Sequence, residues 1–443
     1  MAGNHPRTGL LQAGAAEADI TPTTPQFLYG YPHVPRTSTG VHDPLRSSAL
    51  FLSDGRTQLL LIANDLIFVS RETTLRVRGQ LAEATGVPAA NILLSATHTH
   101  SGPPTADMLV SSADPVVPRT DREYLRFVED RMVQAGVRAV RSAGPAEMAS
   151  AVADATGVGG NRRDPKGPSD PQAPVWVVRA ADSEKTIAAM LVCSMHPTVL
   201  HEDSTLVSAD FPGFAKQYLR RQMVGNCPIL YHTGPSGNQS PRHVVRANTF
   251  DEARRLGEQL GRAVERAILG MTFRRDWPLA CRGEAVDLPR KQFPTLEQAQ
   301  ARLRHAVETL EQLRRQGAPR EQMRTAECDW FGAEEGVVLA RAARDGTLEA
   351  VYRQCLPAEI QVMKLGAQFL VAFPGEFFVE YGLAIKACRA GAFAISLANG
   401  ELQGYIVTPE ALAEGGYEAT NSVFGPDAGQ ALIRRATVIL ESL

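Results

Sequence analysis

The segment from Leu59 to Pro103 reads LLLIANDLIFVSRETTLRVRGQLAEATGVPAANILLSATHTHSGP. Two short apolar runs, 59–66 and 92–94, flank a stretch at 71–84 whose pattern predicts a helix. A strand, a helix and a second strand in this order are typical of α/β proteins, in which a helix connects parallel strands. We therefore expect an α/β fold.

The same alternation continues along the chain. Apolar runs at 187–192, 229–231, 369–373 and 393–397 predict further buried strands, and 252–269 predicts another helix. The predicted fold class is α/β, with a mixed, partly parallel β-sheet flanked by helices. We expect residues 11–443 to form one domain and residues 1–10 to be a disordered N-terminus.

A charged region near residue 300 predicts a helical hairpin inserted into this fold. Thr295 and Gln298 can form a capping box at the start of a helix that runs to Gln316, and Gly317 ends it. A second helix is expected at 334–344 after a loop, so the insertion spans about 294–345. The apolar stripe of the first helix is expected to pack on the sheet. Its members are Leu296, Ala299, Leu303, Val307 and Leu310.

The composition excludes several classes of protein. A net charge of -2 and a pI of about 6.6 give no signal for binding nucleic acid. No window approaches 18 uncharged apolar residues, so no transmembrane segment is expected. The first 22 residues make a poor secretion signal, which favours a cytoplasmic protein. The cysteines have no CxxC spacing, so a thiolate zinc knuckle is not expected.

The strongest local motif is the block at 95–103, SATHTHSGP, which directly follows an apolar run. His98 and His100 are two residues apart in an extended segment, so their side chains lean toward the same side. One metal ion or one substrate could therefore contact both rings. The alternative is a pair of polar loop histidines with no ligand.

Three other motifs follow predicted strands or turns. His196 follows the run at 187–192, with His201 an equally good candidate, and Glu376 follows the run at 369–373 behind a Pro-Gly turn. Glu376 could instead cap a helix that starts at Phe377. Tyr405 and Tyr417 lie twelve residues apart. Two histidines, a carboxylate and a phenolate would suit Zn²⁺ with room for a water, but their spacing along the chain does not show that they converge.

Taken together, these motifs resemble those of the neutral, non-lysosomal ceramidases, zinc-dependent amidases that split N-acylsphingosine into fatty acid and sphingosine. The resemblance runs from about Leu11 to the C-terminus. It implies one Zn²⁺ per chain with His98, His196, Glu376 and Tyr405 as ligands. It leaves His100 free to transfer a proton or to bind the substrate. It also implies that Arg162 lies near the scissile amide, that Tyr417 hydrogen-bonds the substrate, and that Ser240 is an active-site hydroxyl. The segments that carry the resemblance are ADITP (18–22), GVHD (40–43), THTHSGP (97–103), HPT (196–198), SAD (208–210), FPGEF (373–377) and YIVT (405–408).

The sequence departs from this family in several places. Compared with the large secreted members, we expect neither a secretion signal nor a C-terminal immunoglobulin-like domain. The loop at 237–241 reads GNQSP where the family often has Gly-Asp-Val-Ser-Pro, and the arginine segment at 161–164 reads NRRD. These positions leave the implied metal site intact, but they lie in segments that shape the substrate pockets.

We therefore expect a zinc-dependent amidohydrolase that cleaves a linear amide, ceramide-like or another N-acyl amine, by metal-activated water. His100 would act as general base and then as general acid. Nucleophilic attack by Ser240 is less favoured, because no histidine is tied to it in the sequence. Two alternatives remain: a zinc hydrolase of a small non-lipid amide, lactone or ester, and an inactive homologue that binds metal or lipid.

Overall fold

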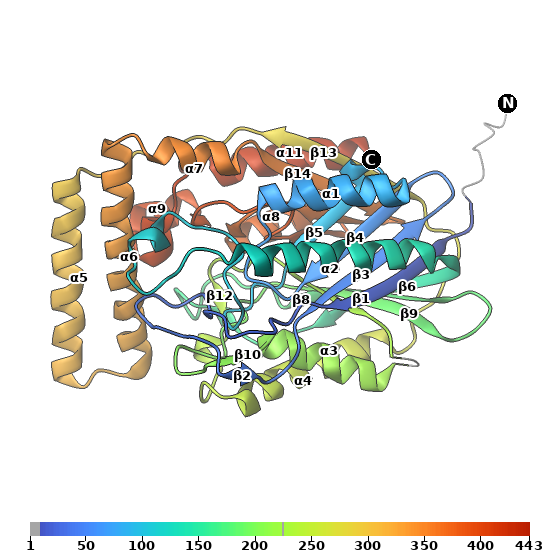
Figure 1. Ribbon diagram of the computed structural model, residues 1–443, viewed down its shortest axis with the longest axis horizontal. Coiled ribbons are helices and arrows are strands. Elements are labelled where there is room, and N and C mark those ends of the chain that lie inside the picture. The colour runs from blue at the N-terminus through green and yellow to red at the C-terminus, as the bar shows by residue number, and fades with distance from the viewer. Residues whose placement is uncertain (1–8, 224–225) are drawn as a thin grey trace.

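In the computed structural model, which describes residues 9–223 and 226–443, two β-sheets stack face to face and carry helices on their outer faces (Figure 1). The larger sheet has eight strands in the order β11-β9-β8-β6-β1-β3-β4-β5. Their bounds are β1 Gln12–Asp19, β3 Arg46–Ser53, β4 Gln58–Asn64, β5 Ile92–Ala96, β6 Gly144–Asp154, β8 Gln172–Ala180, β9 Thr186–Cys193 and β11 Ile229–Thr233. Residues 1–10 were expected to be disordered. Residues 1–8 of this range lie outside the described residues, so the expectation stays a prediction.

The smaller sheet has four strands in the order β13-β14-β15-β17. Their bounds are β13 Leu279–Val286, β14 Ala358–Leu365, β15 Gln368–Ala372 and β17 Ala392–Ile395. Three two-residue pairs add to the sheets: β2 Gly40–Val41 with β10 Leu206–Val207, β7 Gly160–Asn161 with β12 Gln239–Ser240, and β16 Glu376–Phe377 with β18 Tyr405–Ile406. The sheets contain both parallel and antiparallel pairs, which confirms the predicted fold class.

Several strands of the two sheets, among them β4, β5, β14 and β15, are buried on both faces. In β4, Leu59 and Leu61 point into the layer between the sheets, while Leu60 and Ile62 pack against the outer helices. Helices α1 to α4 cover the larger sheet, and α8 and α11 cover the smaller one. A strand buried on both faces is apolar at every position, so the sequence contains continuous apolar runs. Such runs do not reveal which of the two sheets a strand joins.

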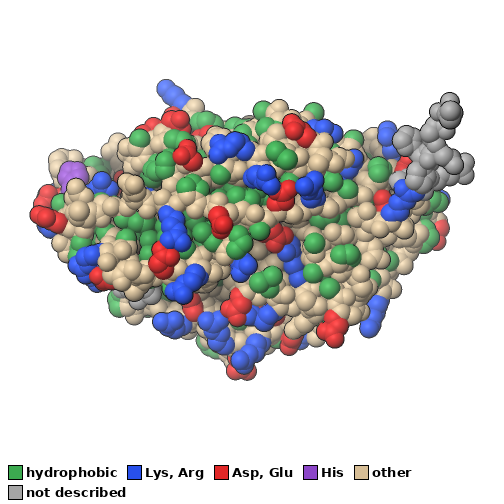
Figure 2. Space-filling view, turned by 90° about the horizontal axis from the view of Figure 1, so that it is seen from above, with side chains coloured by type: hydrophobic (Ala, Val, Ile, Leu, Met, Phe, Trp, Pro, Cys, Tyr) green, Lys and Arg blue, Asp and Glu red, His purple; other side chains and the backbone are tan. Residues whose placement is uncertain are grey.

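The helices fill the outer layers and one end of the molecule (Figure 1). Their bounds are α1 Arg71–Thr85, α2 Arg122–Arg141, α3 Asp210–Gln222, α4 Phe250–Ile268, α5 Leu296–Gln316, α6 Arg320–Arg344, α7 Leu348–Cys355, α8 Val379–Cys388, α9 Pro409–Glu414, α10 Tyr417–Asn421 and α11 Ala428–Ser442. None of the helices described is both long and apolar enough to cross a membrane. Acidic and basic side chains are interspersed over the face seen in Figure 2, as the small net charge suggests.

Three parallel strand pairs position the functional segments. Each is a strand, a helix and a second strand: β4-α1-β5, β9-α3-β11 and β15-α8-β17. In a parallel pair the carboxyl ends of the strands meet at one edge, where α/β proteins place ligand sites. The segment after β17 joins the two sheets there, because Leu397 accepts a hydrogen bond from the Ala96 amide (3.1 Å) and Ser396 donates one to the Thr233 carbonyl (2.8 Å).

The inserted helices differ from the expectation in two respects. The capping box of Thr295 and Gln298 is present, and Gly317 ends α5 in a left-handed conformation (φ 60°). The prediction of a loop before residue 334 was wrong, however, since α6 already begins at Arg320 and packs against α10. The stripe of α5 packs on α6 and not on the sheet, and α5 forms the outer edge of the molecule (Figure 1).

Candidate active site

Three histidines meet at the carboxyl ends of the parallel strands. His98 and His100 follow β5, and His196 follows β9. The ring centroid of His98 lies 4.8 Å from that of His100 and 4.8 Å from that of His196. One nitrogen from each ring lies within 4.8 Å of the other two, so the group could hold a metal ion. The structure thus brings together the two strand-end motifs that the sequence left unconnected.

The backbone around each ring fixes its tautomer. The Nδ1 atoms lie against carbonyl oxygens: His98 on Ile67 (2.9 Å), His100 on Gly30 (3.1 Å) and His196 on Ser236 (2.6 Å). Since a carbonyl only accepts, each ring donates from Nδ1 and keeps its lone pair on Nε2. The Nε2 atoms of His98 and His100 are buried with no hydrogen-bond partner among the described residues. Metal-binding histidines show this arrangement.

Glu376 supplies a carboxylate to the same point. Its Oε2 lies 3.0 Å from Nε2 of His196 and 3.4 Å from Nε2 of His98. Burial alone would raise the pKa of Glu376, but His98 and His196 outweigh burial and hold that pKa well below its usual range. A carboxylate and imidazole lone pairs so close together are all acceptors, so a proton or a cation must lie between them. The donor set therefore fits a divalent cation bound by nitrogen and oxygen.

His100 and His196 are held in the neutral form that a metal ligand or a proton acceptor requires. Burial lowers the pKa of His100 well below its usual value, and the neighbouring His98 and His196 lower it further. Burial, followed by the positive charge of Arg162, lowers the pKa of His196 to about 4. A neutral imidazole has a free lone pair on one nitrogen, so these rings can bind a cation or accept a proton.

Tyr405 lies beside Glu376 because β16 and β18 pair in parallel with these two residues as direct partners. Tyr405 is buried, and burial and the charge of Glu376 raise the pKa of its phenol, while Arg162 opposes the rise. Glu376 does not cap a helix, since α8 begins only at Val379. The helix-capping interpretation of Glu376 was therefore wrong.

Arg162 and Tyr417 lie next to Tyr405. The guanidinium carbon of Arg162 is 5.5 Å from the centroid of the Tyr405 ring, and the Tyr417 ring is 5.8 Å from that centroid. Glu418 accepts a hydrogen bond from Arg162 Nε (2.8 Å) and fixes the guanidinium in place. Arg162 Nη2 is buried and has no hydrogen-bond partner within the described part of the chain. Glu418 is adjacent to Tyr417 in the sequence, but no motif there predicts that it would position Arg162.

Ser240 lies near this group but has a structural partner. It pairs with Gly160 in the β7–β12 bridge, and its Oγ accepts a hydrogen bond from the amide of Arg242 (3.2 Å). Among residues 9–223 and 226–443, no hydrogen bond joins Ser240 Oγ to a histidine. A serine nucleophile needs such a base. His201, the alternative to His196, lies outside the three-histidine group, with its Nδ1 3.4 Å from Glu202.

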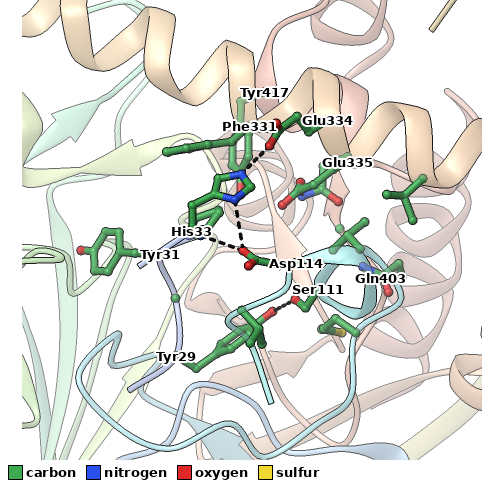
Figure 3. A pocket seen from close by; sticks show the side chains of 18 of the residues that line it. Tyr29, Tyr31, His33, Ser111, Asp114, Phe331, Glu334, Glu335, Gln403 and Tyr417 are labelled. Atoms are coloured by element: carbon green, nitrogen blue, oxygen red, sulfur yellow. Dashed lines mark hydrogen bonds and ion pairs between the residues drawn. The ribbon is translucent and has the colours of Figure 1, made fainter. Parts of the chain in front are cut away.

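The site opens into a cavity of about 500 Å³ (Figure 3). His98, His100, Glu376 and Tyr405 line it, together with many apolar side chains and the charged residues Asp114, Glu334, Glu335 and Arg341. Apolar wall residues are Ile67, Phe68, Met108, Val110, Val117, Leu303, Phe331, Val337 and Val338. Several of these come from α5 and α6, so the inserted helices form part of the wall.

Polar contacts tie α6 to the loops across this cavity. Figure 3 shows His33 between Glu334 of α6 and Asp114: its ring bonds to Glu334, and its backbone amide donates to Asp114 Oδ2 (2.7 Å). Glu335 lies beside them and hydrogen-bonds Asn421. Burial, with the nearby Glu334, Glu376 and Asp114, raises the pKa of Glu335 to about 8. No sequence signal distinguishes Glu335 from a solvated acid on a helix.

Gly30 was also missed. Its φ of +122° lies in the region that favours glycine, and a Cβ there would come within 2.4 Å of Nδ1 of His100. Its carbonyl is the acceptor that orients the His100 ring. In the sequence, Gly30 lies between two tyrosines (YGYPH, 29–33), and this pattern does not predict that it would orient a histidine ring.

A second, smaller cavity of about 110 Å³ shares part of its lining with the first. His100, Tyr405 and Tyr417 line both cavities. Arg162, Ser240 and His201 line only the smaller one. The candidate site thus lies where two cavities of different size adjoin.

Comparison with known proteins identifies the family. Residues 11–234 match the family described as neutral/alkaline non-lysosomal ceramidase, N-terminal. The chain is 23% identical over 521 residues to a neutral ceramidase of Mycobacterium tuberculosis, covering 98% of this chain and 77% of that protein. It is 25% identical to neutral ceramidase B of Dictyostelium discoideum over 231 residues, which is 48% of this chain and 32% of that protein.

Solved structures show the same fold. The crystal structure of neutral ceramidase from Pseudomonas aeruginosa superposes with a TM-score of 0.74 at 18% sequence identity, covering 99% of this chain and 75% of that one. A ceramidase complexed with C2 gives the same TM-score over 98% of this chain and 76% of that one. The family match extends over more than half of the sequence and includes the segments that carry all three histidines of the site. The chain belongs to the neutral/alkaline non-lysosomal ceramidase family.

Proposed function

We propose that this protein is a zinc-dependent amidohydrolase that cleaves a linear amide, a ceramide or another N-acyl amine. The observation that carries the proposal is the convergence of three Nε2 atoms and one carboxylate beside a cavity that has an extensive apolar wall. Membership of the ceramidase family supports amide hydrolysis as the reaction.

In this proposal His98, His196, Glu376 and Tyr405 hold one Zn²⁺. Nitrogen and oxygen donors of this kind suit zinc, and the buried, unpartnered Nε2 of His98 fits a metal ligand. A zinc ion bound there would supply Lewis acidity, which lowers the pKa of water to roughly 7 and polarises a carbonyl.

His100 is the group best suited to move the proton. Its Nδ1 is committed to the Gly30 carbonyl, and its buried Nε2 has a free lone pair. The ring can accept a proton from the attacking water at Nε2 and return it to the leaving amine. In this role His100 is not a ligand, although its position would also allow it to be one.

Arg162 and Tyr417 supply hydrogen-bond donors for the oxyanion. Arg162 Nη2 is buried and unpartnered, so it can donate without first breaking another bond. Donors fixed in place before the reaction stabilise the charge that develops on the carbonyl oxygen. Glu418 holds Arg162 in position through its Nε.

The apolar wall of the larger cavity suits the hydrocarbon chain of an N-acyl amine. A largely apolar pocket with a few convergent polar groups is typical of a small-molecule site. Phe68, Met108 and Val338 contribute to this wall. A small amide, lactone or ester would leave most of it empty, so we favour a substrate with a chain.

The test combines metal analysis with a substrate panel. The wild type should contain about one zinc per chain and hydrolyse N-acylsphingosine or a simpler N-acyl amine, whereas His98→Ala should lose both zinc and activity. His305→Ala, on the exposed face of α5, is the matched control. Full zinc and full activity in His98→Ala would contradict the site. Hydrolysis only of short esters or lactones would favour the small-substrate alternative, and full zinc without any hydrolysis would favour an inactive homologue.

A further inference from the structure

The smaller cavity has an excess of positive charge. Four arginines line it, and Glu321 is the one acidic residue among the described residues of its lining; the arginines are Arg162, Arg242, Arg320 and Arg324. The larger cavity has the opposite character, since Asp114, Glu334, Glu335 and Glu376 line it with Arg341. A substrate at the candidate metal site would therefore meet a basic cavity on one side.

Two of these arginines have carboxylate partners. Arg324 Nη1 lies 3.2 Å from Glu202 and 3.3 Å from Glu327, and Arg162 Nε lies 2.8 Å from Glu418. These contacts leave Arg162 Nη2 buried, without a partner, at the edge of the cavity that adjoins Tyr405. A buried guanidinium nitrogen without an acceptor is costly.

The other two arginines have no carboxylate within ion-pair distance in the described part of the chain. Arg242 donates to the carbonyl of Arg162 (3.4 Å) and to Cys328 Sγ (3.4 Å). Arg320 donates to the side chain of Asn248. Neutral acceptors do not compensate a positive charge, so guanidinium groups gathered around one small cavity favour an anion there.

We propose that this cavity binds an anionic group of the substrate, a carboxylate, sulfonate or phosphate. A volume of about 110 Å³ is large enough for such a group. Because His100, Tyr405 and Tyr417 also line this cavity, the anion lies a few bonds from the scissile amide. This inference rests on the proposed amidase function and narrows it: the preferred substrate is an anionic N-acyl amine, whereas ceramide carries no such charge.

The test uses the full, zinc-loaded chain and three chain-matched amides. N-lauroylethanolamine is neutral, N-lauroyltaurine carries its anion on the amine side, and N-dodecylsuccinamic acid carries it on the acyl side. We expect kcat/KM for one of the anionic amides to exceed that for the neutral amide by about tenfold or more, as one charge-assisted hydrogen bond would give. Which anionic amide is preferred shows the side of the scissile bond that enters the cavity.

Variants assign the preference to the arginines. Arg242→Gln/Arg320→Gln should bring the ratio of anionic to neutral kcat/KM close to one. Arg304→Gln/Arg315→Gln removes two charges from the exposed face of α5 and is the matched control, in which the ratio should persist. A wild type with no charge preference, or a preference unchanged in Arg242→Gln/Arg320→Gln, would overturn the inference and leave the amidase function intact.

A binding measurement separates this inference from the proposed function. Titration calorimetry on EDTA-treated protein should show N-lauroyltaurine or N-dodecylsuccinamic acid binding more tightly than N-lauroylethanolamine, with a difference that shrinks at high salt. The difference should be absent in Arg242→Gln/Arg320→Gln. If zinc-loaded protein hydrolysed no amide but kept this binding preference, the amidase proposal would fail and the anion site would stand. Equal binding of all three amides would contradict the anion site.

Discussion

Glu376 and Tyr405 are direct partners in a two-residue parallel bridge between β16 and β18. Glu376 comes after β15 and Tyr405 comes after β17, which are strands of the smaller sheet. His98 and His196 follow strands of the larger sheet. The candidate metal site therefore lies at the interface between the two sheets. Its four proposed ligands meet only when both sheets are folded and stacked, so metal binding and the sheet interface should stabilise each other.

Replacement of His100 should separate proton transfer from metal binding. In His100→Ala we expect zinc content close to that of the wild type and a loss of kcat of about 10²–10⁴-fold, because the general base is removed. The measurement is zinc analysis of the purified variant together with amide hydrolysis. Loss of zinc along with activity would make His100 a ligand instead.

Gly30 should act as a positioning residue for His100. A Cβ in Gly30→Ala would lie 2.4 Å from Nδ1 of His100, so the ring must move away from the carbonyl that orients it. We expect kcat to fall by about 10²-fold, with KM and zinc content little changed.

Gly79→Ala is the matched control for Gly30. Gly79 lies within α1, where an added Cβ would meet nothing within 4 Å. The substitution should stabilise the protein by about 0.5–1 kcal/mol, as Gly to Ala does in a helix interior, and should leave turnover unchanged. Equal activities of the two alanine variants would show that Gly30 does not control the His100 ring.

Glu335 should make the stability of the metal-free protein fall with rising pH. Its pKa is raised from an ordinary value of 4.5 to about 8, so the folded state binds a proton that the unfolded state has already released between these pH values. This contribution to stability is present below pH 4.5 and is lost as pH rises through 8. The loss should amount to a few kcal/mol.

Urea denaturation of EDTA-treated wild type and Glu335→Gln across this pH range measures the effect. Glutamine resembles the protonated carboxyl but does not titrate, so the variant should lose less stability with rising pH than the wild type. Parallel stability curves for the two proteins would contradict a raised pKa for Glu335.

A buried ion pair should hold α3 against the larger sheet. Lys216 Nζ lies 2.6 Å from both carboxylate oxygens of Asp65, and both residues are buried. Lys216→Met leaves the carboxylate buried and unpaired, which should lower the free energy of unfolding by about 3–5 kcal/mol. The double variant Asp65→Asn/Lys216→Met should recover most of this loss, as chemical denaturation would show. A double variant no more stable than Lys216→Met would contradict the pairing.

The position of the site was largely predictable from sequence because the signal is local. His98, His196 and Glu376 each follow an apolar run, and these runs form strands of parallel pairs. Strand ends of such pairs meet at one edge, which is why these residues could be named in advance. The parallel bridge between Glu376 and Tyr405 could not be predicted, because the distance between these residues along the chain does not indicate that they pair.

The two cavities could not be predicted, because they depend on contacts between distant segments. Arg162 follows β7, Arg242 follows β12, and Arg320 and Arg324 lie in the first turns of α6, so three segments far apart in the sequence supply the four arginines. The first half of α6 was expected to be a loop, so Arg320, Arg324 and Phe331 were not expected on a cavity wall. The apolar stripe of α5 was expected to pack on the sheet, and this was wrong because the stripe packs on α6; the stripe itself does not distinguish between two apolar surfaces.

The most direct test is the anomalous diffraction of a zinc-loaded crystal. We predict one strong zinc peak within bonding distance of Nε2 of His98 and His196, a carboxylate oxygen of Glu376 and the phenol oxygen of Tyr405, at about 2.0–2.2 Å for nitrogen and carboxylate oxygen. No peak at this point under zinc-saturating conditions, or a peak bound by other residues, would contradict the proposed metal site and the mechanism that depends on it.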